Sequence, residues 1–253
     1  MPDALPPRVG AAAAAAAIVF VSALAAPPSP AEPTNIAGMI VFLDPGHGGG
    51  TDASITRQVS DGRGGTKDCQ ISGTNTNDGY PEHTFTWDVV LRMRTLLNQL
   101  GVRSAMSRGN DDAPGPCVDE RATMGNAIHP NAIVSIHADS GPPTGRGFHV
   151  NYSAPPLNQA QAVPAVQLAQ MIRDQLQNSG IPPANYIGTD GLYGRADLAG
   201  LNFAQYPAVL IDLGNMKNPA DSAVMTTPDG RQKYAAAVVQ GIATFLGTRG
   251  VMH

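Results

Sequence analysis

The chain has 253 residues, of which 42% are hydrophobic and 14% charged, and its formal net charge is −4 at pH 7. This balance is that of a folded globular protein. It argues against nucleic acid as a partner, because a nucleic-acid interface needs clustered basic residues, and no basic stretch suggests a membrane surface. The length suits one domain with a sizeable core, and no internal repeat is visible.

Residues 1–25 have the pattern of a secretory signal peptide. Arg8 supplies a positive charge, residues 11–24 are apolar but too few to span a bilayer comfortably, and Ala23-Leu24-Ala25 fits a small-residue cleavage site. An uncleaved anchor or an alanine-rich helix is the alternative. Residues 26–37 are rich in proline and should form a mobile lead-in. We therefore expect an exported protein, secreted or in the cell envelope, with no membrane span in the mature chain.

The folded domain is expected over residues 38–250 and opens with a buried strand. The run from Met39 to Leu43 is apolar and β-branched, as such a strand requires. Asp44-Pro45-Gly46 then breaks the strand and leads to His47, which three glycines follow. Because glycine leaves space around the imidazole, a metal and a substrate can approach it closely. A plain glycine-rich turn with a surface histidine is the alternative.

Residues 51–80 are polar, rich in Gly, Thr, Asn and Asp, and without periodicity. A stretch of this length is uncommon in a compact domain, so it predicts either a functional loop or a locally mobile one. Pro81 then suits the start of a helix, and apolar residues recur at helical spacing over 85–100 until Gly101. Glu82 therefore begins this helix, where the helix dipole favours its charged form. By itself it would be an ordinary helix-start carboxylate.

The rest of the chain alternates apolar strands with helices. One strand, over 132–139, contains His137, and another, over 208–214, contains Asp212. The other elements expected are strands over 102–106 and 147–152, helices over 118–128, 163–176 and 233–246, and a loop or short helical turn over 194–201. This alternation predicts a single α/β domain, with a mostly parallel twisted sheet and helices on both faces.

Four polar residues should converge on one rim of that sheet. In parallel sheets ligands bind outside the carboxyl ends of the strands, and His47, His137 and Asp212 lie at or just past such ends. Glu82 begins the helix after the first strand, so it belongs to the same rim. Two imidazoles and one carboxylate form a common open zinc site, in which a further carboxylate can act as the base. We expect Zn²⁺ bound by His47, Glu82 and His137, with Asp212 as the catalytic base.

The other histidines are weaker ligand candidates. His83 would point about 100° around the helix from Glu82. His129 precedes a proline in a loop, His149 lies in the middle of a strand, and His253 is terminal.

The two cysteines, Cys69 and Cys117, are expected to form a disulfide. In an oxidising compartment two thiols in loop-like contexts most often pair. The closed loop would contribute about 4 kcal/mol in the chain-entropy model. Two separate buried thiols are the alternative. A cysteine-based zinc site is disfavoured, because neither cysteine has a second cysteine or a histidine at ligand spacing.

The motifs together resemble one known family. In order, the chain contains Asp-Pro-Gly-His-Gly-Gly at 44–49, the helix-start Glu82, Ser-Ile-His-Ala at 135–138 and Pro-Ala-Val-Leu-Ile-Asp-Leu-Gly-Asn at 207–215. This set resembles the zinc-dependent N-acetylmuramoyl-L-alanine amidases of the type-3 family, mycobacterial members above all. Ser107-Arg108 and Glu120-Arg121-Ala122 resemble secondary signatures of that family. The resemblance covers residues 40–246.

Departures from the family pattern concern the active site. Asp212 stands where the family usually has Glu, which leaves the base one methylene further from the water. Asp139 stands where the family usually has Asn, which adds a carboxylate near the metal. The loop over 51–80 is longer than usual. By the resemblance, Asp139, Arg108 and Asn215 are expected to contact substrate.

The resemblance implies an exported zinc amidase, expected to be a monomer, that acts on peptidoglycan or small muropeptides. It would hydrolyse the amide bond between N-acetylmuramic acid and L-alanine. A non-catalytic muropeptide- or envelope-binding protein is one alternative, which the aspartate at position 212 keeps open. Another zinc hydrolase of the cell wall, such as a peptidase or a deacetylase, is a second alternative.

Overall fold

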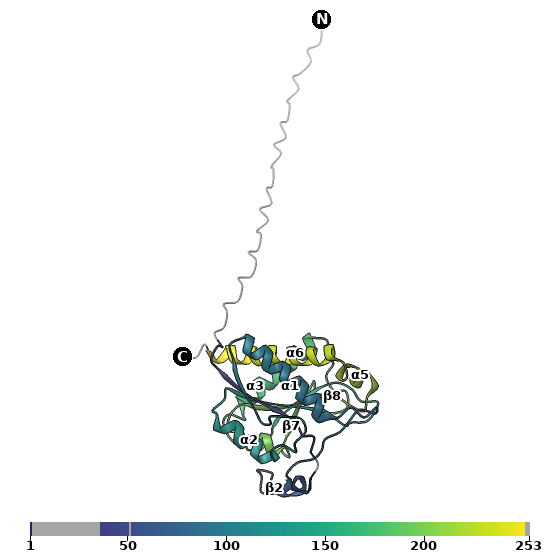
Figure 1. The fold of residues 1–253 in the computed structure, drawn as a ribbon. Coiled ribbons are helices and arrows are strands. Elements are labelled where there is room, and N and C mark those ends of the chain that lie inside the picture. Colours follow the sequence, from purple (N-terminus) through teal and green to yellow (C-terminus); the bar gives the residue numbers. More distant parts are fainter. Residues whose placement is uncertain (2–35, 51, 251–253) are drawn as a thin grey trace. The chain divides into compact units, whose positions relative to one another are not determined.

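The computed structural model describes Met1, residues 36–50 and residues 52–250 (Figure 1). The expected signal peptide after Met1 and residues 26–35 of the expected lead-in lie outside the described residues, so both stay predictions. Among the described residues, no helix is long and apolar enough to cross a bilayer.

The central sheet has six strands in the spatial order β4-β1-β5-β8-β6-β7. The strands are β1 (Ile40–Pro45), β4 (Arg103–Met106), β5 (Ala132–Asp139), β6 (His149–Ser153), β7 (Leu192–Arg195) and β8 (Ala208–Asn215). The first four in the spatial order are parallel to one another, whereas β6 runs antiparallel to β8 and β7 is parallel to β6. The expected mostly parallel sheet is therefore confirmed. The carboxyl ends of β1, β5 and β8 meet the amino end of β6 at one edge.

Helices cover both faces of this sheet, as predicted. They are α1 (Glu82–Gln99), α2 (Val118–Ala127), α3 (Val163–Asn178), α4 (Ala199–Asn202), α5 (Pro219–Met225) and α6 (Pro228–Gly250). Figure 1 shows α1, α3 and α6 on one side of the sheet and α2 on the other. The division follows from the alternation of side chains along β1. Val41 and Leu43 join the large core cluster under α1, α3 and α6, while Phe42 packs with Leu201 of α4 and against Gly125 of α2.

The final helix is longer than the sequence predicts. It begins at Pro228, whereas apolar periodicity marks only 233–246, because its first turn is polar. The short helix α5 before it has no counterpart among the expected elements. Its N-cap is supplied by Asn218, whose side-chain oxygen accepts from the backbone N–H of Ala220 at 3.0 Å.

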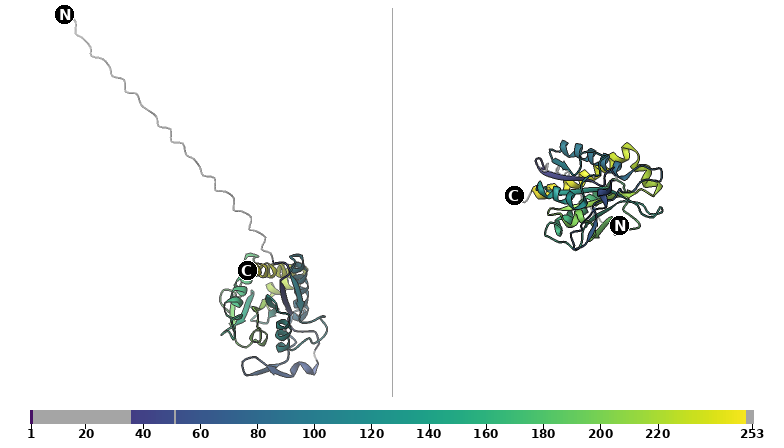
Figure 2. Two further views of the ribbon diagram at one scale, coloured as in Figure 1. Left: turned by 90° about the vertical axis from the view of Figure 1, so that its left-hand side faces the viewer. Right: turned by 60° about the horizontal axis from the view of Figure 1, so that its bottom comes forward.

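The polar stretch 51–80 contains a small hairpin that its sequence does not reveal. A 3₁₀ turn, η1 (Ala53–Thr56), precedes strands β2 (Gln58–Ser60) and β3 (Thr66–Asp68), which pair antiparallel. Three-residue strands are too short to show alternation. The hairpin lies on the side of the domain opposite α6 (Figures 1 and 2). Arg63 fastens its turn to the main fold by donating to Asn202 Oδ1 and to Ser153 Oγ, both at 3.0 Å.

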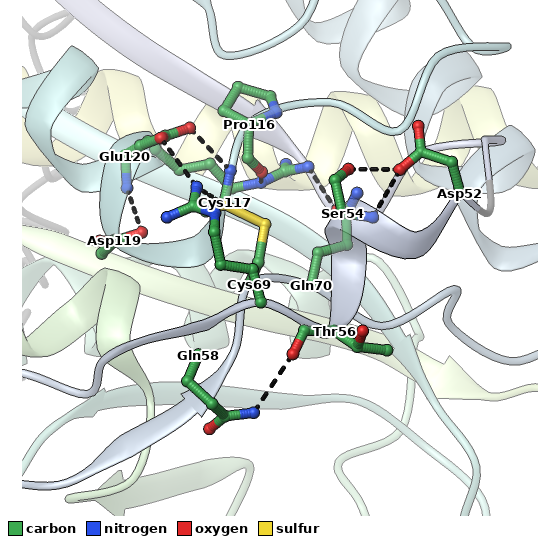
Figure 3. Close-up of a disulfide and its surroundings, with 12 residues drawn as sticks. Asp52, Ser54, Thr56, Gln58, Cys69, Gln70, Pro116, Cys117, Asp119 and Glu120 are labelled. Atoms are coloured by element: carbon green, nitrogen blue, oxygen red, sulfur yellow. Dashed lines mark hydrogen bonds and ion pairs between the residues drawn. A yellow bond between two sulfur atoms is a disulfide. The ribbon is translucent and has the colours of Figure 1, made fainter.

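Cys69 and Cys117 form a disulfide, as predicted, with their Cα atoms 4.4 Å apart (Figure 3). Both are buried beside Val59 of the hairpin and against Val118 of α2. The backbone N–H of Cys117 also donates to the Glu120 carboxylate at 3.1 Å, which caps the start of α2. The bond therefore joins the long polar stretch, just after β3, to the N-cap of α2.

Candidate metal centre and active site

His47 lies two residues past the end of β1 with its backbone in the left-handed region, at φ 59°. Residues other than glycine rarely adopt this backbone conformation, so neighbouring groups must stabilise it at His47. Arg121 donates from Nη2 to the His47 carbonyl at 2.7 Å. The imidazole Nδ1 lies 2.8 Å from the Ile71 carbonyl, which can only accept, so Nδ1 carries a proton and donates it. The ring thus turns Nε2 toward the other predicted ligands.

A buried ion pair between Arg121 and Asp44 stabilises this conformation of His47. Arg121 Nη1 lies 2.7 Å from Asp44 Oδ1, and the hydroxyls of Ser107 and Ser135 also donate to the Asp44 carboxylate, at 2.5 and 2.7 Å. Burial would raise the pKa of Asp44, but the Arg121 charge and the two hydroxyl hydrogen bonds outweigh it and lower the pKa to about 2. Arg121 is thus held by Asp44 while it holds His47.

Glu82 is the first residue of α1 and is 3% exposed. Its Oε2 accepts from the Thr74 N–H at 2.9 Å and its Oε1 from the Ala138 N–H at 3.0 Å. Burial would raise its pKa, but the charge and hydrogen bonds of His47 and His137 hold the pKa of Glu82 far below its usual range. The position at a helix N-terminus favours the same ionised form.

Glycine makes room for the two imidazoles. A Cβ at Gly46 would lie 2.3 Å from Cε1 of His137, and a Cβ at Gly73 would lie 2.9 Å from Cγ of His47. Gly73 also has φ +80°, which a larger residue would adopt only with strain. Gly46 therefore allows close approach to the site, whereas the three glycines after His47, from which this was expected, lie against residues 111–114.

The three predicted ligands meet at one point. Glu82 Oε1 lies 3.0 Å from His47 Nε2 and 3.1 Å from His137 Nδ1, and the two ring nitrogens are 3.1 Å apart. One ligand atom from each residue lies within 4.8 Å of the others.

This donor set fits a divalent metal. Since Nδ1 of His47 carries a proton, its Nε2 faces the Glu82 carboxylate with a lone pair when the ring is neutral. Without a metal, a proton between His47 Nε2 and the Glu82 oxygen is needed to avoid repulsion of their lone pairs. Burial lowers the pKa of His47, but the charge and hydrogen bond of Glu82 outweigh burial and raise that pKa above its ordinary value. A cation bound between them would satisfy the same lone pairs. Ile71 and the backbone N–H groups on Glu82 provide the outer hydrogen bonds usual for metal ligands.

Asp212 lies on β8 directly beside His137 of β5 in the strand register. Its Oδ2 accepts from Nε2 of His149 at 3.0 Å and from Nδ2 of Asn151 at 2.9 Å. Burial would raise the pKa of Asp212, but the hydrogen bond from His149 and the electrostatic effect of the two nearby imidazoles outweigh burial and lower it. The carboxylate is therefore ionised at neutral pH and available to accept a proton.

A cavity of about 700 Å³ opens over these residues on the α2 and α4 face of the sheet. All four predicted site residues line it, together with Asp139 and His149. Its further walls include Phe42, Lys67, Gln70, Ile71, Val118, Ile133, Arg195, Leu198, Leu201 and Leu210. Several of these come from the stretch 51–80, so that stretch forms part of the cavity wall. Of the two interpretations of this stretch, the functional loop is the one that this placement favours.

The three expected substrate contacts lie in different places. Asp139 lines the cavity, and its Oδ2 accepts from the Tyr186 hydroxyl at 2.8 Å. Arg108 is 6% exposed, outside the cavity wall, and donates to the carbonyls of Pro45 and His83 at 3.1 and 2.8 Å.

Asn215 is fully buried and holds the loop after β5. Its Oδ1 accepts from the Gly141 N–H at 3.1 Å, and its Nδ2 donates to the carbonyls of Pro142 and Gly145 at 2.8 and 2.9 Å. These contacts give Arg108 and Asn215 a structural role, so only Asp139 is placed where a substrate contact requires.

The weaker histidine candidates are placed elsewhere, except one. His83 Nδ1 lies 2.9 Å from Asp111, and His129 Nδ1 lies 2.6 Å from the Tyr206 hydroxyl. His253 lies outside the described residues. His149, judged weak because it seemed to lie mid-strand, is the first residue of β6 and contacts the candidate base. Only the antiparallel pairing of β6 with β8, which the sequence does not show, could have drawn attention to it.

The fold and the site are typical of a class of protein, hydrolases of the α/β type, here with a candidate metal centre. Three candidate ligands would leave one coordination position open on a bound metal, and a carboxylate lies on the neighbouring strand, as in hydrolytic metal sites.

Comparison with known proteins identifies the family. The family model for N-acetylmuramoyl-L-alanine amidase matches residues 41–244. The amidase Rv3717 of Mycobacterium tuberculosis is 68% identical over 242 residues, which cover 96% of this chain and 98% of that protein. The crystal structures of Ami1 from Mycobacterium smegmatis and Mycobacterium abscessus are similar, with TM-scores of 0.84 and 0.82 and identities of 70% and 63%. They cover 85% and 83% of this chain, and 99% of each of their own chains is matched. The chain belongs to the N-acetylmuramoyl-L-alanine amidase family and is an enzyme of that class.

Proposed function

We propose that this chain is a zinc-dependent amidase of the cell envelope. It hydrolyses the amide bond between N-acetylmuramic acid and L-alanine in peptidoglycan or its fragments. The observation that carries the proposal is the meeting of His47, Glu82 and His137 in a cavity that Asp212 also lines. The family match over residues 41–244 supports the choice of the bond that is cleaved.

Zinc is the metal proposed, with His47, Glu82 and His137 as its ligands. Nitrogen and oxygen donors in a set of three suit Zn²⁺, whereas Ca²⁺ takes six to eight oxygen ligands. When bound, the ion would polarise the scissile carbonyl and make a water molecule more acidic.

Asp212 is proposed as the general base and then the general acid. Its carboxylate accepts one proton from water as the water oxygen forms a bond to the carbonyl carbon of the lactyl group. It returns that proton to the nitrogen of L-alanine as the carbon–nitrogen bond breaks. One water is consumed, and the products are the lactyl carboxylic acid and the free amine of the stem peptide.

Asp139 is proposed to contact the substrate, because it lies on the cavity wall at the end of the strand that bears His137. Its Oδ2 is held by Tyr186, while its Oδ1 accepts only from the backbone N–H of Ser140, at 2.7 Å, among the described residues. A carboxylate held in this way is suited to accept from a hydroxyl or amide N–H of a muropeptide.

Export through the signal peptide at 1–25 is proposed on the sequence pattern, and the disulfide is consistent with an oxidising compartment. Activity in the envelope would place the enzyme with its substrate.

The decisive experiment is product analysis by mass spectrometry, with zinc content measured on the same protein. Purified enzyme is incubated with digested peptidoglycan before and after removal of zinc by a chelator. The proposal expects free stem peptide with an L-alanine amino terminus, its loss on chelation and its return with Zn²⁺. Shortened peptides, released acetate or activity that survives complete zinc removal would each contradict it.

A further inference from the structure

His149 begins β6 directly opposite Asp212 of β8. Its side chain is buried, the whole residue being 1% exposed, and its Nε2 lies 3.0 Å from Asp212 Oδ2. Asn151, two residues along the same strand, donates to the same oxygen at 2.9 Å. Among the described residues no hydrogen bond reaches Oδ1 of Asp212. One oxygen of the carboxylate is therefore held by two donors, and the other is left to react.

The surroundings of the His149 ring fix which nitrogen carries the proton. Nδ1 is buried and has no hydrogen-bond partner among the described residues. A buried N–H without an acceptor is unfavourable, so a single proton on Nε2, donated to Asp212, is the arrangement that fits. The rings of Tyr186 and Tyr193 contact the imidazole edge-on, with centroids 6.5 and 6.2 Å away, and limit its rotation.

We propose that His149 is a positioning residue for the catalytic base, an inference that rests on the proposed role of Asp212. By holding Oδ2 together with Asn151, it presents Oδ1 to the water and the leaving nitrogen. Asp212 has one rotatable bond fewer than the glutamate usual in the family, so its carboxylate can reach fewer positions around the water. Its orientation must come from its neighbours, and His149 is the neighbour that also lines the cavity.

The test compares His149→Leu with His149→Gln on a defined muropeptide, with zinc content measured for each. Leucine removes the donor, and we expect kcat to fall about ten- to a hundredfold, the usual effect of losing a hydrogen bond to a charged group, with KM nearly unchanged. Glutamine retains an N–H donor and should recover part of the loss. Full stoichiometric zinc is expected in both variants, since neither change touches a ligand.

A double variant separates positioning from a general structural effect. Asp212→Asn and His149→Leu combined should be no slower than Asp212→Asn alone, because His149 acts only through the carboxylate. Multiplied losses in the double variant would overturn the proposal. A wild-type kcat in His149→Leu, or a glutamine variant as slow as the leucine variant, would also overturn it.

His129→Leu is the matched control. It makes the same substitution at an exposed histidine that contacts Tyr206 and does not line the cavity, so its kcat should equal that of the wild type. Failure of the proposed function is distinct from failure of this inference. In the first case the wild-type protein would release no stem peptide, whereas in the second it would be active and insensitive to the His149 substitutions.

Discussion

Replacement of Arg121 by methionine should damage both stability and metal binding. The guanidinium lies 2.7 Å from the Asp44 carboxylate and also donates to the carbonyls of Pro45 and His47 and to Gln70. Methionine has a similar length but no donor. It would leave Asp44 charged and buried with only its two hydroxyl partners.

The magnitude follows from the environment of Asp44. Breaking a buried pair by removing one partner typically destabilises by about 3–5 kcal/mol. The net shift in the pKa of Asp44, from 3.8 to about 2, corresponds to about 2.5 kcal/mol at 1.36 kcal/mol per pKa unit, and it combines the effects of burial, the hydroxyl hydrogen bonds and Arg121. We therefore expect Arg121→Met to lose about 3 kcal/mol of unfolding free energy at pH 7.

The loss should depend on pH in a defined direction. In the wild type, the lowered pKa of Asp44 contributes stability that is present above pH 3.8 and is lost as pH falls toward 2. In the variant the Arg121 charge is gone, so the pKa of Asp44 should be higher than in the wild type. Protonation then removes an unfavourable charge, so the difference between variant and wild type should shrink as pH falls below neutrality. Urea unfolding of both proteins over a pH series measures this difference.

Metal affinity should fall along with stability. Arg121 donates to the His47 carbonyl and so stabilises the left-handed backbone conformation of His47. Loss of a hydrogen bond that orients a metal ligand usually weakens metal binding about 10- to 100-fold. Zinc competition titration with a chromophoric chelator measures it. Arg57→Met is the control: Arg57 and Glu120 are 58% and 53% exposed, and such a pair contributes at most about 1 kcal/mol. An Arg121→Met protein within 1 kcal/mol of wild type at pH 7, or with wild-type zinc affinity, would refute the reasoning.

Three further outcomes are expected. His47→Ala or His137→Ala should lose stoichiometric zinc and activity together, and full metal content in either variant by elemental analysis would show the ligand assignment to be wrong. Asp212→Asn should keep zinc and fold but lose about 10²-fold or more in rate on muropeptide. Asp212→Glu should retain measurable activity, because both side chains carry a carboxylate. An unchanged rate in the Asn variant would point to Asp139 as the base. Replacing Cys69 and Cys117 by serine should lower unfolding free energy by about 2–5 kcal/mol, since the bond closes a loop of 48 residues, and denaturant midpoints equal to wild type would contradict this.

Much of the site follows from local sequence. A parallel sheet brings the carboxyl ends of its strands to one edge, so His47 and His137 could be placed together without knowing the strand order. Glu82 follows from the helix start beside that edge. The disulfide follows from chemistry, since only two thiols are present in a chain with an export pattern.

Other features were decided only by contacts between distant segments. The family resemblance suggested substrate contacts for Arg108 and Asn215, but their hydrogen-bonding groups are turned inward to backbone carbonyls and N–H groups that no motif reveals. The hairpin of β2 and β3 likewise has strands too short for a periodic signal, and Arg63 ties it to Asn202, far along the chain.

The partner of the catalytic base is the clearest case. Sequence alone indicated that Asp212 follows an apolar strand segment near the ligand edge, because the hydrophobic pattern is a local property; β8 in fact continues past it to Asn215. Tertiary structure decided what holds that carboxylate. Strand β6 turns antiparallel and places His149, 63 residues away in the chain, opposite Asp212 in the register. Strand pairing depends on the packing of the whole sheet, so no local sequence pattern around His149 could predict its contact with Asp212.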